Sequence, residues 1–276
     1  MNKANTLDAK YLAILKEISD KGFESGDRTG TGTKKLFGRM ITHDMKEGFP
    51  LLTTKKMFWK GILIELLWFL KGDTNIKYLV DNGVNIWVGD CYKKYVHVCS
   101  ANSSEFNDFL RDNNDGTLSL FTEKEFIEQI KTNHAFAREW GNLGTVYGKE
   151  WVDWYGINQV KELVNTLKTN PNNRRMMVTA WNPVHVKTAT LPPCHYAWQV
   201  FTRELTITER QEIAHKYATT DDFMKIANKE RLDAMKVPER EISLMFQMRS
   251  VDMPLGYPFD IASYGFLLSM IAQCVN

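Results

Sequence analysis

The last stretch of the chain places the strongest constraint on the fold. Residues 264–275 are apolar on nearly every side of the helix that they would form. Large side chains point in all directions from it: Phe266, Leu267, Leu268, Met270 and Ile271. A helix that is hydrophobic all round belongs inside a core, with other elements packed against each of its faces. We therefore expect a layered globular fold built around this helix.

Composition and charge exclude several classes of protein. The 276 residues are 43% hydrophobic and 25% charged, which excludes a disordered or fibrous chain. A net charge of +2 gives no global field toward DNA or an anionic membrane. The N-terminus lacks the apolar stretch of a secretory signal, and the longest apolar run, residues 61–70, is too short to cross a bilayer. We expect a cytoplasmic protein.

The hydrophobic pattern mixes helices and strands without a regular βαβ rhythm. Helical periodicity occurs at residues 11–18, 57–71 and 157–167, and short β-prone runs occur at 176–181, 197–203 and 242–248. This pattern predicts the α+β class and a single domain over residues 1–276. Two stretches look like insertions. Residues 88–142 are polar and irregular, with a helical segment near 122–131, and residues 206–240 are charged and helix-prone.

Two residues stand out as chemical candidates, each with a structural alternative. Cys194 lies in the segment LPPCH, but an isolated cysteine is more often a small buried hydrophobe than a nucleophile. Glu65 interrupts an apolar helix, so it is paired, protonated or functional, unless it faces water at the helix edge. The four cysteines form no CxxC pair or zinc spacing, and we assign no metal ligands.

Four arginines are flanked by small or polar residues instead of a charge run: Arg28, Arg174, Arg175 and Arg249. Planar guanidinium groups suit bidentate contact with phosphate, although each arginine alone reads as an ordinary surface residue. The loop around Arg28, DRTGTGT, resembles a phosphate cradle but lacks the Lys-Ser/Thr pair of a P-loop, which argues against a nucleoside triphosphatase. In the segment 249–260, Asp260 could simply cap the final helix.

These segments together resemble the thymidylate synthase family. The matching motifs, in family order, are DRTGTGT (27–33), FPLLTTKK (49–56), ELLWFLKGDTN (65–75), LGTVYG (143–148), NRR (173–175), PCH (193–195) and RSVDMPLGYPFD (249–260). The resemblance implies an α+β homodimer that associates through its sheet. It also implies action on a pyrimidine deoxynucleoside monophosphate with 5,10-methylenetetrahydrofolate.

The resemblance also implies roles for individual residues. Cys194 would add to C6 of the ring, favoured by nearby arginines, and Glu65 would organise proton transfers through water with help from Tyr147. Arg174 and Arg175 would reach the neighbouring subunit's site. The implied catalytic residues are Cys194, Glu65, Tyr147 and Asp252. The implied nucleotide ligands are Arg28, Arg174, Arg175, His195, Arg249, Ser250, Asp252, Gly256 and Asp260. The implied folate contacts are Glu65, Ile86, Trp87, Asp252, Leu255, Gly256 and Phe259.

The chain departs from the family pattern at positions that bear on substrate choice. Members that form thymidylate have Asn where this chain has Asp260, and an amide matches both the N3–H and the O4 of uracil. An ionised carboxylate would instead accept from the amino group and a protonated N3 of cytosine. Met248 replaces a usual Gln, and Phe58 replaces a basic residue near the folate. His195 keeps the thymidylate-forming pattern.

On this basis we expect a deoxycytidylate C5 one-carbon transferase, similar to the phage hydroxymethylases. Of its two possible activities, hydroxymethylation is favoured somewhat over methylation. One alternative is thymidylate formation from deoxyuridylate. A second alternative is an inactive homologue that binds nucleotide or RNA. The resemblance further implies a continuation after residue 276, so we expect either a fragment or a second polypeptide that completes the fold.

Overall fold

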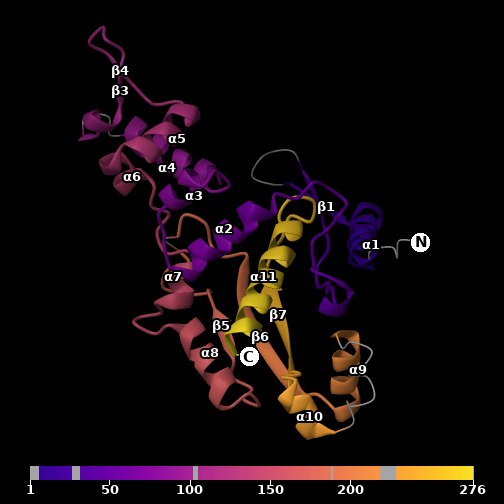
Figure 1. The fold of residues 1–276 in the computed structure, drawn as a ribbon. Helices are drawn as coiled ribbons and strands as arrows, with labels where there is room; N and C mark the ends of the chain where they lie inside the picture. Colours follow the sequence, from indigo (N-terminus) through magenta and orange to yellow (C-terminus); the bar gives the residue numbers. More distant parts are fainter. Residues whose placement is uncertain (1–5, 27–31, 102–104, 188, 218–227, 276) are drawn as a thin grey trace.

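A computed structural model of the chain describes residues 6–26, 32–101, 105–187, 189–217 and 228–275 (Figure 1). Its centre is an antiparallel three-stranded sheet with the order β5 (Met177–Thr179), β6 (His195–Glu204) and β7 (Arg240–Met248). Val178 pairs with Trp198, and Trp198 pairs in turn with Phe246. Residues aligned across a sheet share one face, so these three side chains mark the inner face of the sheet.

Helices cover this inner face. The long helix α11 (Tyr257–Val275) packs against α2 (Trp59–Leu70), β7 and α8 (Gln159–Thr169), and α7 (Tyr147–Val152) lies between α2 and α8 (Figure 1). Among the described residues, α11 alone is long and apolar enough to span a membrane. Its Leu267 and Ile271 are buried in the main core, so it serves here as a core helix.

The main core is rich in aromatic side chains. Its largest fully buried members include Trp68 from α2, Trp151 from α7 and Trp198 from β6. The Trp151 and Trp198 rings meet edge to face with their centroids 5.7 Å apart, a favoured geometry for aromatic pairs. This packing fixes α2 and α7 on the sheet, and these two helices carry two of the predicted site residues.

The N-terminal segment packs on the start of α11. It contains α1 (Thr6–Lys21), the hairpin of β1 (Phe23–Ser25) and β2 (Thr33–Lys35), and the short helix η1 (Met45–Glu47). Leu7 and Tyr11 from α1 form a second buried cluster with Tyr257 and Ile261 from α11. The Tyr11 hydroxyl donates a hydrogen bond to the Met253 carbonyl at 3.0 Å, and this bond holds the turn before α11.

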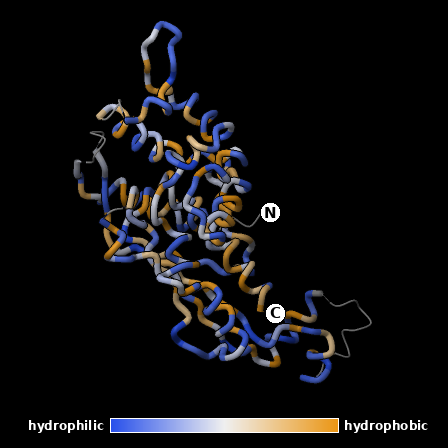
Figure 2. The backbone as a smooth tube through the Cα atoms, turned by 90° about the vertical axis from the view of Figure 1, so that its left-hand side faces the viewer, coloured by the Kyte–Doolittle hydropathy of each residue, from blue (hydrophilic) through white to orange (hydrophobic). Residues whose placement is uncertain are grey.

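Residues 88–142 form a helical lobe beside α2. The lobe contains α4 (Val88–Ala101), η3 (Asn107–Phe109), β3 (Arg111–Asp112), β4 (Leu118–Ser119), α5 (Glu123–Thr132) and α6 (His134–Trp140), and α3 (Lys77–Asp81) precedes it (Figure 1). The predicted helix near 122–131 is confirmed, but the prediction of an irregular segment was wrong. The reason is that Tyr95 and Trp140 pack edge to face within the core. Only the hairpin of β3 and β4 projects as a mostly hydrophilic loop (Figure 2).

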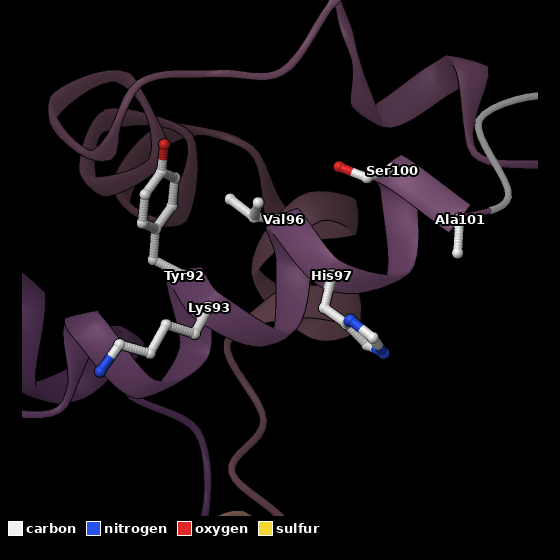
Figure 3. Close-up of a pocket in the computed structure, with 6 residues that line it drawn as sticks. All are labelled: Tyr92, Lys93, Val96, His97, Ser100 and Ala101. Carbon is white, nitrogen blue, oxygen red and sulfur yellow. The ribbon is translucent and has the colours of Figure 1, made fainter. Parts of the chain in front are cut away.

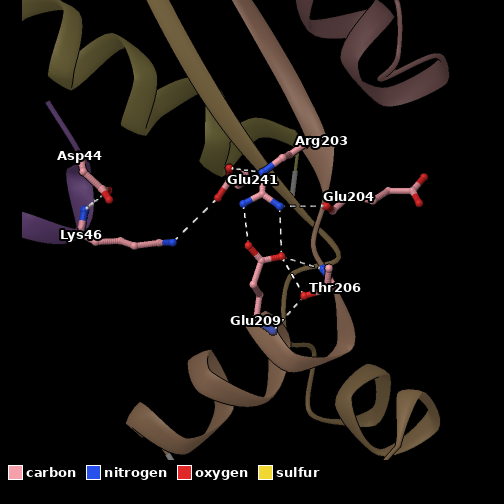
Figure 4. Close-up of polar contacts among 7 residues, drawn as sticks. All are labelled: Asp44, Lys46, Arg203, Glu204, Thr206, Glu209 and Glu241. Atoms are coloured by element: carbon pink, nitrogen blue, oxygen red, sulfur yellow. Dashed lines mark hydrogen bonds and ion pairs between the residues drawn. The ribbon is translucent and has the colours of Figure 1, made fainter. Parts of the chain in front are cut away.

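Residues 206–217 and 228–240 form an extension at the far end of β6 and β7. Helices α9 (Ile207–Tyr217) and α10 (Lys229–Ala234) enclose a small cluster of Ala214, Leu232 and Val237. Arg203 anchors α9, because it pairs with Glu209 at 2.7 Å and with Glu241 at 2.6 Å (Figure 4). Both this segment and residues 88–142 stay predicted insertions.

The sequence pattern located the main elements correctly. The helices predicted at 11–18, 57–71 and 157–167 correspond to α1, α2 and α8, and the three predicted strands correspond to β5, β6 and β7. β6 and β7 pair with each other as antiparallel strands. One structural alternative was wrong: α11 begins at Tyr257, so Asp260 lies inside its first turn and is not its N-cap.

The two adjacent leucines of α11 test its placement. Leu267 is fully buried and Leu268 is half-buried. We expect Leu267→Ala to lower the free energy of unfolding by about 2–5 kcal/mol, because it leaves a cavity between helix and sheet. Leu268→Ala should cost clearly less. Chemical denaturation of both variants measures the difference, and equal losses would contradict this orientation of α11.

Candidate active site

Cys194 immediately precedes β6, and its backbone is fixed on both sides. Its N–H donates to the Tyr147 hydroxyl at 2.8 Å, and its carbonyl accepts from the Arg249 N–H at 2.8 Å. The two prolines before it restrict the approaching chain. The thiol is half-buried, so it is positioned by the fold and still open to a ligand.

Arg249 places a positive charge beside this thiol. Its Nε and Nη2 donate to the carbonyls of Pro193 and Pro192, both at 2.9 Å, and Nη2 lies 3.9 Å from Cys194 Sγ. The guanidinium also lies 5.8 Å from the centroid of the Trp181 ring. Arg249 is exposed, so the same guanidinium is available to an anionic ligand group.

His195 is held by three aromatic residues. Its ring stacks on Tyr147 with a centroid distance of 3.9 Å and an interplanar angle of 7°. Its Nδ1 is hydrogen-bonded to the Tyr264 hydroxyl at 2.8 Å, and Phe69 packs near it with centroids 6.2 Å apart. Burial lowers the pKa of His195 to about 3. The imidazole is therefore neutral at neutral pH, so it can offer a ligand hydrogen bonds but no charge.

Glu65 on α2 lies close enough to Tyr147 and Asp260 for its charge to act on both. Its Oε1 accepts from the indole N–H of Trp87 at 2.7 Å. Burial raises the pKa of Glu65 to about 7, although the Trp87 hydrogen bond opposes this rise by stabilising the ionised form. A carboxyl group with a pKa near neutrality is suited to both accept and donate a proton. Of the alternatives left open by the sequence, burial with a raised pKa excludes a carboxylate that simply faces water, and the functional role of Glu65 stays a prediction.

Asp260 is the second carboxyl group of the site. Its Oδ1 lies 4.0 Å from Nε2 of His195, and its side chain is 23% exposed. Burial, and to a lesser extent the neighbouring charge of Glu65, together raise the pKa of Asp260 to about 8. At neutral pH the protonated form of Asp260 therefore dominates.

An exposed apolar surface lies around Glu65 and the turn before α11. The expected folate contacts Ile86 and Leu255 are 57% and 68% exposed. Lys55 lies with its Nζ 5.1 Å from the centroid of the Phe259 ring, and it also donates to the Pro254 carbonyl at 2.7 Å. Apolar side chains with a lysine among them would suit a folate, which has a flat pterin ring and carries its carboxylates on a glutamate tail. Phe58, at the expected basic position, is 51% exposed.

The turn at 252–256 has a clear structural role. Asp252 Oδ1 accepts from the Leu255 N–H at 2.8 Å, and the Asp252 carbonyl accepts from the N–H groups of Gly256 and Tyr257. These bonds close the turn that leads into α11. Ser250 and Asp252 are both exposed, and their expected ligand contacts stay predictions.

Arg174 and Arg175 lie at the other end of the sheet. The residue after them, Met176, accepts from the Val200 N–H at 3.0 Å. Val200 is six residues along β6 from Cys194, which corresponds to about 20 Å at the rise of a strand. The two arginines are exposed. They therefore do not reach Cys194 of their own chain. Arg28 lies outside the described residues.

A separate shallow depression runs along α4. It is lined by Tyr92, Lys93, Val96, His97, Ser100 and Ala101 (Figure 3). None of these is a predicted site residue. The Tyr92 and His97 side chains point to different sides of the helix (Figure 3), so they do not converge on a common ligand.

Sequence reasoning missed the role of Tyr264 and one contact of Trp87. Tyr264 was assigned only to a buried helix, yet it holds the His195 ring. Its position four residues after Asp260 places both side chains on one helix face, and that spacing was the available signal. Trp87 was expected at the folate, whereas its bond to Glu65 depends on tertiary packing between α2 and residue 87.

Comparison with known proteins agrees with this geometry. The family model described as thymidylate synthase matches residues 9–276. The chain belongs to the thymidylate synthase family. It is 41% identical over 267 residues to a thymidylate synthase of Mesoplasma florum, covering 97% of this chain and 75% of that protein. The thymidylate synthases of Aster yellows witches'-broom phytoplasma and Mycoplasma mobile are 41% and 39% identical, with 74% and 75% of each covered.

The thymidylate synthase family uses 5,10-methylenetetrahydrofolate as one-carbon donor, acts on pyrimidine nucleotide monophosphates and is generally dimeric. The expected resemblance to the family is thereby confirmed.

The assignment to deoxycytidylate hydroxymethylation was wrong, and so was the likeness to phage enzymes. These relatives, at 39–41% identity, are named thymidylate synthases. The assignment of deoxycytidylate as substrate depended on an ionised Asp260. Burial instead raises the pKa of this carboxyl to about 8, so the carboxylate that would repel uracil is the minor form at neutral pH.

The indole of Trp87 provides a test of the proton held at Glu65. We expect Trp87→Phe to raise the pKa of Glu65 by on the order of one pH unit, because the ionised carboxylate loses a hydrogen-bond donor. An NMR titration of carboxyl-labelled glutamate measures it, and Glu65→Gln identifies the signal by removing it. An unchanged or lower pKa would show that Trp87 does not stabilise the ionised form.

Proposed function

We propose that this chain methylates C5 of deoxyuridine monophosphate (dUMP) to form thymidylate. The observation that carries the proposal is the fixed, half-buried Cys194 with the Arg249 guanidinium 3.9 Å from its sulfur. The relatives are named thymidylate synthases, and this supports thymidylate as the product. Intact Cys194 and Glu65 favour an enzyme over an inactive binding homologue, because a binding module has no use for a nucleophile.

The nucleotide is held at both ends in this proposal. Arg249 binds the phosphate and keeps C6 of the ring beside the sulfur. The thiolate form of Cys194, which has already lost its S–H proton, forms a bond from Sγ to C6, and the electron pair of the C5–C6 double bond moves toward C5 and O4. The Tyr147 hydroxyl accepts from the Cys194 N–H, so its own O–H is free to donate toward the ring.

Glu65 moves the protons of the reaction. The proton at C5 must leave before the bond between Cys194 and C6 breaks. A carboxyl with a pKa of about 7 has both forms available within one cycle. The family's methylenetetrahydrofolate supplies the one-carbon unit and the hydride when it is bound. In this proposal the folate is held beside Glu65 by four side chains: Ile86, Trp87, Leu255 and Phe259.

The nucleophile and the product test this function together. The chain should convert dUMP, in the presence of methylenetetrahydrofolate, to a product heavier by one CH2 unit, because a methyl group replaces the hydrogen at C5, as read by mass spectrometry. Cys194→Ser should abolish turnover yet retain nucleotide binding, because the arginine contacts remain. Cys274→Ser, at an exposed cysteine, is the matched control and should turn over normally. A product formed only from deoxycytidylate, or full activity of Cys194→Ser, would refute the proposal.

We also infer a homodimer that forms through the outer face of the sheet. Met177 and Met245 are 53% and 45% exposed, both align with Gln199 of β6, and Phe201 on the same face is 61% exposed. An apolar sheet face of this kind is typical of an interface. In such a dimer, the exposed Arg174 and Arg175 would contribute to the site of the neighbouring subunit.

The apolar helix α11 packs into the core, which supports a cytoplasmic location.

A single charge tests the interface. Phe201→Glu should convert the dimer to a monomer and lower activity strongly, because it buries an unpaired carboxylate between subunits. Leu118→Glu is the control, since Leu118 is 44% exposed on the β3–β4 hairpin. Light scattering coupled to size exclusion measures both variants. If Phe201→Glu stays dimeric and active, the subunits do not meet through this face.

A further inference from the structure

Glu150 is a buried carboxyl group that the proposed reaction does not use. It lies on α7, three residues after Tyr147, and only 3% of it is exposed. A carboxylate is almost never buried in this way unless it is paired. Two side chains that pair with it come from residues 181–194, the segment that leads from β5 to Cys194 and is described apart from residue 188.

Two hydrogen-bond donors converge on the Glu150 carboxylate. Its Oε1 lies 2.6 Å from Nδ1 of His185, and its Oε2 accepts from Nδ2 of Asn182 at 3.3 Å. A carboxylate can only accept, so Nδ1 of His185 carries the hydrogen. Nδ2 of Asn182 also lies 3.1 Å from that Nδ1, because both groups meet the same carboxylate. This position therefore requires two acceptor oxygens, and a carboxamide would supply only one.

Helix α7 holds both ends of the segment 181–194. Near its start, the turn that Glu150 binds is closed by Asn182, whose Oδ1 accepts from the Val184 N–H at 3.1 Å. At its end, the Tyr147 hydroxyl accepts from the N–H of the nucleophilic cysteine at 2.8 Å. The start of the segment is thus placed relative to its end by a single short helix.

Trp181 connects this clamp to the nucleophile. It directly precedes Asn182, and the centroid of its ring lies 5.8 Å from the Arg249 guanidinium. A guanidinium over an indole is attracted to the negative face of the ring. Nη2 of Arg249 lies in turn 3.9 Å from Cys194 Sγ. The position of the indole therefore influences where the cation lies beside the thiol.

We propose that Glu150, acting through Asn182 and His185, is a positioning residue for the methyl transfer. It fixes the start of the segment 181–194, so that the indole keeps the guanidinium beside the thiol. This inference rests on the proposed function, because it concerns the same nucleophile and the same phosphate ligand. Without the clamp, the thiolate loses part of its stabilising charge and the phosphate loses a fixed partner.

Alkylation of Cys194 tests the clamp without nucleotide or folate. The rate of its reaction with iodoacetamide at neutral pH, read on the Cys194 peptide by mass spectrometry, reports the stabilisation of the thiolate. Glu150→Gln sets a donor against a donor, and His185→Leu removes a donor. Both variants should lower the rate about two- to fivefold, as expected for the loss of an exposed charge interaction. His185→Asn keeps an N–H close to the position of Nδ1 and should restore most of the parental rate.

Steady-state kinetics separate positioning from a purely structural role. In Glu150→Gln the KM for dUMP should rise and kcat should fall, because both phosphate binding and the nucleophile are affected. A purely structural role would lower the melting temperature and leave the alkylation rate and the KM of the folded protein unchanged. Glu162→Gln, at an exposed glutamate of α8, is the matched control and should behave as the parent chain in all of these measurements.

The outcomes are distinct. Unchanged or faster alkylation of Cys194 in Glu150→Gln or in His185→Leu would overturn the proposal, and so would an equal loss in His185→Asn and His185→Leu. A parent chain that forms no thymidylate from dUMP, yet shows the expected alkylation differences, would refute the proposed function alone. A parent chain that forms thymidylate, with alkylation that does not depend on Glu150, would refute only the role of Glu150.

Discussion

Two carboxyl groups, Glu65 and Asp260, lie within electrostatic reach of each other without a paired cation in the described part of the chain, and the chemistry of the site depends on this constraint. Burial raises the pKa of both carboxyls, and the charge of Glu65 contributes to the rise at Asp260. Both carboxyls therefore hold protons close to neutrality. His195, whose Nε2 lies 4.0 Å from Asp260 Oδ1, is neutral and offers hydrogen bonding without charge. These surroundings favour an uncharged ring in the proposed complex, while Arg249 supplies positive charge for the phosphate.

The fold creates this environment by bringing four elements to one place. Helix α2 supplies Glu65, α7 supplies Tyr147, the start of β6 supplies Cys194 and His195, and α11 supplies Asp260. The aromatic core fixes these elements against each other, because Trp151 of α7 packs edge to face on both Phe69 of α2 and Trp198 of β6. The hydrogen bond from Cys194 to Tyr147 joins two of these elements directly. Small shifts in that core would separate the nucleophile from the proton-carrying groups.

The sequence predicted the order of elements well, since it follows from local patterns, and the site residues stay predictions that rest on motifs. Periodicity located α2, α8 and the three strands, and motifs located Cys194, Glu65 and Arg249. It failed where the outcome depends on tertiary surroundings. The state of Asp260 is set by burial and by Glu65, which lies 195 residues earlier in the chain. Apart from the predicted helix near 122–131, the helices of residues 88–142 were missed because their burial, as at Tyr95, comes from distant aromatic partners.

The central claim is that Asp260 carries a proton at neutral pH, and vibrational spectroscopy tests it most directly. The infrared difference spectrum between the parent chain and Asp260→Asn, recorded at neutral pH, isolates the carboxyl of this residue. We predict the carbonyl stretch of a protonated carboxylic acid, which is replaced by carboxylate bands as the pH rises above about 8. Carboxylate bands at neutral pH, with no protonated carbonyl signal, would contradict the account.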